Sequence, residues 1–274
     1  MIIRSFKDWI KNNISSRFLE LISSKAISIT RIPKAKSSVS DLFILRIENN
    51  WETYFECLHF YNLFDPKNII KPQEVEFCFY NKSGYFIGKK IIVLKSNFKN
   101  TVNISDLAKS LGVNGDGTFA VFHKYKELWF SESDSFPAER GYIGYFNPTI
   151  GSIKSFIHGN LDAISKNNKN YKYSLLGNYS FFKKHYYLQN LLKSEFKYEL
   201  FLVNPSSVNQ KITIIEKNTK TIKKKTSILP RNGFFKYDKD IHSKDVNIEI
   251  HSKLYMARPV VFKLMNSSFD VFHG

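Results

Sequence analysis

The last two-thirds of this chain reads as two successive sets of seven short apolar segments that recur in the same order. The first set occupies residues 55–62, 75–84, 90–94, 102–106, 119–123, 140–146 and 156–159. The second set occupies residues 198–204, 212–218, 225–229, 234–238, 248–251, 258–264 and 270–274. Short apolar runs separated by Gly, Asn and Pro turns are typical of antiparallel strands. The pattern therefore predicts an all-β chain that arose by internal duplication.

Polar residues at matching positions favour the duplication more than the apolar matches do, because aromatic strands resemble one another by composition alone. The gaps between segments vary in length, as surface loops do. The matched polar pairs are Asn62 with Asn204, His123 with His251, Arg140 with Arg258, and His158 with His273.

We therefore predict two tandem antiparallel β-sandwich domains, of the jelly-roll or Ig-like type, over residues 40–165 and 171–274. A chain of 274 residues is long enough for two domains of this size. The polar, Asn- and Lys-rich stretch 164–174 marks the predicted boundary. Helix is predicted only in short pieces, at 105–112 and, more weakly, at 181–196.

Residues 1–39 are predicted to form an N-terminal amphipathic helix followed by a polar linker. Phe6, Trp9, Ile10 and Ile14 recur at spacings of three and four, which places them on one helical face. The basic residues around this stripe leave two alternatives. The helix either docks on the first domain or makes peripheral contact with an anionic membrane surface.

The net charge of +17 does not by itself predict a nucleic-acid partner. The chain has 34 Lys and only 7 Arg, whereas base recognition favours the bidentate Arg side chain. The Lys-rich composition is instead typical of an AT-rich bacterial genome. The start of the chain has no secretory pattern, and no apolar run is long enough to span a bilayer. The sequence thus predicts a cytoplasmic protein that binds no nucleic acid.

The candidate functional residues lie at the ends of the predicted strands. His123, Arg140 and His158 meet if the last three segments of the first set share one sheet end. An Arg fork binds carboxylate or phosphate, and His donates or accepts a proton near neutral pH. The neighbouring loops add Glu139, Tyr142 and Asn160, and the second-set counterparts are His251, Arg258 and His273.

This set of side chains predicts non-enzymatic binding of a carbohydrate or another small anionic ligand, in a context such as bacterial surface-glycan assembly. One alternative is a lyase, isomerase or hydrolase acting on a sugar acid, with His123 or His158 as the catalytic base. Another is a structural or oligomeric scaffold, in which these His and Arg side chains only tie strands together. No ligand spacing matches a known metal motif, so neither a metal nor a cofactor is predicted.

Overall fold

The computed structural model of the protein describes most of the chain from residue 37 onwards. The described residues are 37–59, 72–94, 99–124, 138–139, 141–159, 163–167, 172–175, 179–218, 221–240, 244–254 and 258–274. The amphipathic helix predicted near the N-terminus lies outside these residues. The last residues of the predicted linker, from Ser37, belong to strand β1.

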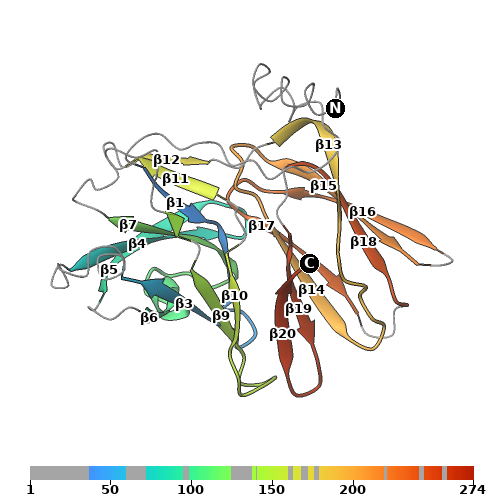
Figure 1. Cartoon of the computed structure of the whole chain (residues 1–274), viewed down its shortest axis with the longest axis horizontal. Helices are drawn as coiled ribbons and strands as arrows, with labels where there is room; N and C mark the ends of the chain where they lie inside the picture. The colour runs from blue at the N-terminus through green and yellow to red at the C-terminus, as the bar shows by residue number, and fades with distance from the viewer. Residues whose placement is uncertain are drawn as a thin grey trace, which may run out of the picture.

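Three four-stranded sheets come from the first part of the chain, and each takes its name here from one central strand (Figure 1). The order in the β1 sheet is β12 (Lys172–Leu175), β11 (Ala163–Asn167), β1 (Ser37–Asp41) and β8 (Ala138–Glu139). In the β3 sheet it is β10 (Ser155–His158), β9 (Tyr142–Phe146), β3 (Glu52–Leu58) and β6 (Lys99–Asn103). In the β4 sheet it is β2 (Phe43–Leu45), β7 (Gly117–Lys124), β4 (Gln73–Asn81) and β5 (Phe86–Leu94).

Two further four-stranded sheets come from the second part of the chain. The order in the β15 sheet is β13 (Tyr179–Tyr187), β18 (Asn247–Leu254), β15 (Gln210–Lys217) and β16 (Ile222–Leu229). In the β14 sheet it is β17 (Phe234–Lys239), β14 (Lys197–Val203), β19 (Val260–Leu264) and β20 (Phe269–His273). Strand β16 forms one edge of its sheet, where Lys223, Lys224 and Lys225 are exposed.

Local sequence explains most of these elements. Strand β3 alternates between half-buried and buried residues, as a strand with one face on a core does. The short helix α4 (Ile104–Lys109) begins where the Asn103 side chain accepts a hydrogen bond from Asp106 N, and it agrees closely with the helix predicted there. The helix weakly predicted at 181–196 is wrong, because the residues to Tyr187 pair with β18 as strand β13 and the residues after them form turns and a single bridge at Leu192.

One hydrophobic cluster crosses from the first part of the chain to the second. It fills the space between the β3 and β4 sheets with aromatic side chains, and it continues onto one face of the β14 sheet through Phe201 and Phe262. Leu200 and Leu202, on the opposite face of β14, pack in a second cluster with the β15 sheet. Strand β14 is therefore buried on both faces, since successive side chains point to opposite sides of a strand.

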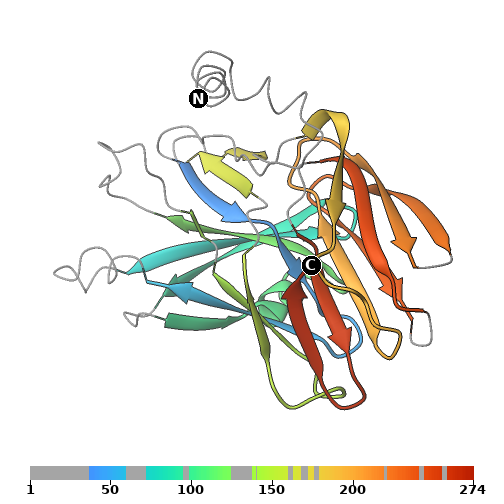
Figure 2. The same cartoon turned by 45° about the vertical axis from the view of Figure 1, so that its right-hand side comes forward.

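This packing corrects the predicted fold class. The chain is all-β as predicted, but the two tandem β-sandwich domains are wrong. Four of the small sheets stand as blades in a propeller-like ring, and the β1 sheet packs beside the β4 sheet through contacts between β1 and β7 (Figures 1 and 2).

Because the two β-sandwich domains are wrong, the prediction that they arose by internal duplication is wrong as well. The order β10-β9-β3-β6 does match the order β20-β19-β14-β17, yet the shared cluster joins both sets of strands into one packed body. The boundaries proposed at 40–165 and 171–274 remain predictions.

A buried ion pair lies where the two parts of the chain meet. Arg46, which follows β2, is only 2% exposed, and its Nη2 atom lies 2.7 Å from Oε2 of Glu199 on β14. The guanidinium carbon lies 4.1 Å from the ring centre of Trp51 and 4.4 Å from that of Phe262. Burial raises the pKa of Glu199, but the charges of Arg46 and Lys236 outweigh burial and hold this pKa below its ordinary value.

In the part of the chain that the structure describes, no helix has both the length and the apolar character that a bilayer crossing requires.

Candidate functional site

Two of the predicted histidines, one from each part of the chain, lie side by side. His158 ends β10 and His273 ends β20, and these edge strands of the β3 and β14 sheets run next to each other (Figure 1). The two ring centres are 4.8 Å apart. His273 Nε2–H donates a hydrogen bond to the backbone oxygen of His158 at 2.9 Å.

A small cavity opens beside this pair, and Arg258 also lines it. The cavity volume is about 20 Å³, which is room for one water molecule or for one polar atom of a larger ligand. His158, Arg258 and His273 are called the cavity site below. The remaining wall is mostly apolar and includes Ile143, Ile157 and Phe201.

Three basic side chains line the cavity site. The pKa of His273 is lowered to about 4, mainly by burial; the hydrogen bond to the His158 backbone acts against this, and the nearby Arg258 acts with it. Among the described residues, Nδ1 of His273 is buried and has no hydrogen-bond partner. The neutral imidazole thus keeps one ring nitrogen that a ligand or a proton can still occupy.

Exposed aromatic side chains adjoin the cavity site on the outer face of the β3 sheet. Tyr142 is 57% exposed and pairs directly with His158 across β9 and β10. Phe156 is 40% exposed and covers Gly144, where an added Cβ atom would lie 2.5 Å from the Phe156 ring. Cross-strand partners lie on the same face of a sheet, so these two rings flank His158 on one surface.

Among the other predicted residues that the structure describes, His123 lies away from the cavity site. His123 is buried on β7, where its Nδ1 atom accepts a hydrogen bond from Gln73 Nε2, and it does not line the cavity. Glu139 belongs to β8, but its side chain is outside the described structure, as are Arg140 and Asn160. The structure therefore brings together two predicted first-set residues, His158 and Tyr142, with the two second-set residues Arg258 and His273.

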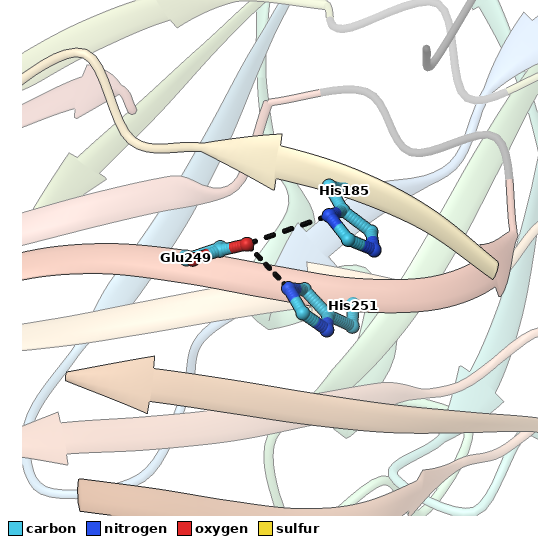
Figure 3. A group of neighbouring side chains, drawn as sticks. All are labelled: His185, Glu249 and His251. Atoms are coloured by element: carbon cyan, nitrogen blue, oxygen red, sulfur yellow. Dashed lines mark hydrogen bonds and ion pairs between the residues drawn. The ribbon is translucent and has the colours of Figure 1, made fainter. Parts of the chain in front are cut away.

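The remaining second-set residue, His251, belongs to a different group on the β15 sheet. Figure 3 shows His185 of β13 beside Glu249 and His251 of β18. Their potential ligand atoms all lie within 4.8 Å of one another, so this group can hold a metal ion. Neither His185 nor Glu249 was predicted. Glu249 could have been found, because residues two apart on a strand share a face.

Comparison with protein-family models, with curated proteins and with solved structures found no match to this chain.

Proposed function

We propose that the protein binds a small anionic carbohydrate, such as a sugar acid, at the cavity site without transforming it. The observation that carries the proposal is the convergence of His158, Arg258 and His273 on one cavity beside the exposed rings of Tyr142 and Phe156. A cytoplasmic location, a role in surface-glycan assembly and a membrane contact of the N-terminal segment belong to this proposal as predictions from sequence alone.

Each part of a sugar acid has a matching feature at this surface. The anionic group suits the cavity, because Arg258 lines it and an Arg fork pairs well with a carboxylate. The cavity accepts only an atom or two of the ligand. The sugar ring therefore lies outside it, where Tyr142 and Phe156 offer apolar faces for stacking.

Binding without turnover is favoured over the enzyme alternative by the position of His123. A catalytic base must lie within hydrogen-bond reach of the proton that it removes. His123 is 2% exposed and engaged with Gln73, and the cavity is lined by other residues. His158 remains at the cavity, so the binding experiment should also follow chemical change in the ligand.

We expect titration calorimetry to detect binding of glucuronate or galacturonate but not of glucose, which lacks the carboxylate. His158→Ala and Tyr142→Ala should each weaken binding by about tenfold or more, the cost of losing a charge-assisted hydrogen bond or a stacked ring. His185→Ala and Tyr85→Ala are matched controls, because both side chains are exposed and neither lines the cavity. Equal affinities for glucose and glucuronate, or equal losses in the controls, would contradict the proposal.

Binding should strengthen as the pH falls from 7 towards 5. A bound carboxylate raises the pKa of His273 above its value of about 4, so binding takes up a proton, and a lower pH favours that uptake. The affinity can rise at most about tenfold for each pH unit. His273→Gln should flatten the plot of log affinity against pH relative to the unaltered protein. An unchanged slope in this variant would show that His273 is not the group that takes up the proton.

A further inference from the structure

A second site, separate from the cavity site, lies on the outer face of the β15 sheet. His185 of β13 is directly opposite His251 of β18 in the strand register. Glu249 precedes His251 by two residues and so lies on the same face of β18. The neighbouring Ile248 and Ile250 point the other way, into the hydrophobic cluster between the β15 and β14 sheets.

The three side chains already point toward one another (Figure 3). His251 Nε2 lies 2.5 Å from Oε1 of Glu249, and His185 Nδ1 lies 3.5 Å from the same oxygen. The two imidazole rings are stacked, with their centres 3.9 Å apart and their planes 8° from parallel. Two imidazoles and one carboxylate thus surround a single point on the sheet surface.

The geometry points to a site for a divalent transition-metal ion, with His185, Glu249 and His251 as its three protein ligands. Two imidazoles with one carboxylate are a recurrent ligand set for zinc and for non-haem iron. Atoms that bind one zinc ion at bond lengths of about 2.1 Å lie at most about 4.2 Å apart, close to the observed limit of 4.8 Å. The His185 side chain is 48% exposed, so its ring has room on the solvent side to adjust to an ion.

The ligand set runs from the buried Glu249 to the half-exposed His185, so an ion would enter from the His185 side. Lys217 Nζ donates a hydrogen bond to Oε2 of Glu249, which fixes the carboxylate and leaves Oε1 facing the imidazoles. Metal binding needs an unprotonated Nε2 on His251, and the tautomer with its proton on Nδ1 provides it. A fourth position on the metal then faces solvent and takes water.

The test uses the full chain, freed of metal by chelation, and titrates it with Zn²⁺ by calorimetry. We expect saturable binding of one ion that His185→Ala and His251→Ala each weaken by at least about tenfold, whereas His158→Ala leaves it unchanged. Mg²⁺ and Ca²⁺ should not compete, because they prefer sites made only of oxygen ligands. Zn²⁺ should also raise the melting temperature of the unaltered protein but not that of His185→Ala.

Binding only near or above about 1 mM Zn²⁺, or equal binding by His185→Ala and the unaltered protein, would overturn the metal site. A loss of Zn²⁺ binding in His158→Ala but not in His185→Ala would place the ion at the cavity site instead, and would also overturn it. His185 is exposed, so its variant should melt at the same temperature as the unaltered protein in chelator. These outcomes do not depend on whether the cavity site binds sugar acids.

Discussion

Replacing Glu199 with alanine should lower the free energy of unfolding by about 3 to 5 kcal/mol, the usual cost of leaving one member of a buried ion pair without its partner. Among the described residues, Arg46 would then keep only a distant carboxylate, since its Nε atom lies 3.9 Å from Oδ2 of Asp116. Two nitrogens of Arg46 already have no hydrogen-bond partner among the described residues, so the loss cannot be absorbed locally. Urea denaturation followed by tryptophan fluorescence would measure the change, because Trp51 packs against the guanidinium.

Two further variants separate the buried pair from surface effects on the same carboxylate. Lys236→Ala removes the other, partly exposed partner of Glu199 and should cost less than about 1 kcal/mol. Replacing both partners, with Arg46→Met and Glu199→Leu, should recover much of the stability, because apolar side chains of similar volume often substitute well for a buried pair. A loss below about 1 kcal/mol in Glu199→Ala would show that the pair contributes little.

Gly84→Ala should destabilise the protein by about 3 kcal/mol or more. Gly84 has a φ of +78°, and an added Cβ atom would lie 1.7 Å from the backbone oxygen of Arg231. The left-handed backbone alone costs an alanine about 1 to 2 kcal/mol. The clash would also separate two turns that are joined by a hydrogen bond from Phe234 N to Lys82 O, and each hydrogen bond lost costs about 1 kcal/mol.

Gly112→Ala is the matched control, because it reproduces the backbone strain without the clash. Gly112 has a φ of +79°, and nothing lies within 4 Å of an added Cβ atom. Chemical denaturation should therefore give a loss of only about 1 to 2 kcal/mol for Gly112→Ala. If both variants lost the same amount, the contact between the two turns would contribute nothing to stability.

Local pattern was enough to predict most strands but not how their sheets pack. Strand β3 alternates as expected of a strand with one buried face. Strand β14 is apolar at consecutive positions, with Leu200 and Phe201 on opposite faces in different hydrophobic clusters. Such a run indicates that both faces of the strand are buried, but it does not identify the sheets that pack against each face. The sandwich prediction failed at this step.

The candidate sites depended on contacts between distant segments. His158 and His273 were chosen as equivalent residues of two separate domains, whereas the ring of sheets places them beside each other. His185 was missed because its segment has a mixed period and was interpreted as helix. Once that segment is a strand, its pairing with β18 sets His185 opposite His251, and no spacing along the sequence encodes that register.

The lysines of β16 oppose edge-to-edge association between copies of the protein. An edge strand presents unpaired backbone groups that can recruit another chain and start a fibre. Strand β16 is such an edge, and it carries three exposed lysines, Lys223, Lys224 and Lys225. Two molecules that approach each other through this edge would bring like charges close together. This electrostatic repulsion opposes the pairing of β16 with a strand from another molecule. Part of the large positive charge thus has a role that requires no polyanionic partner.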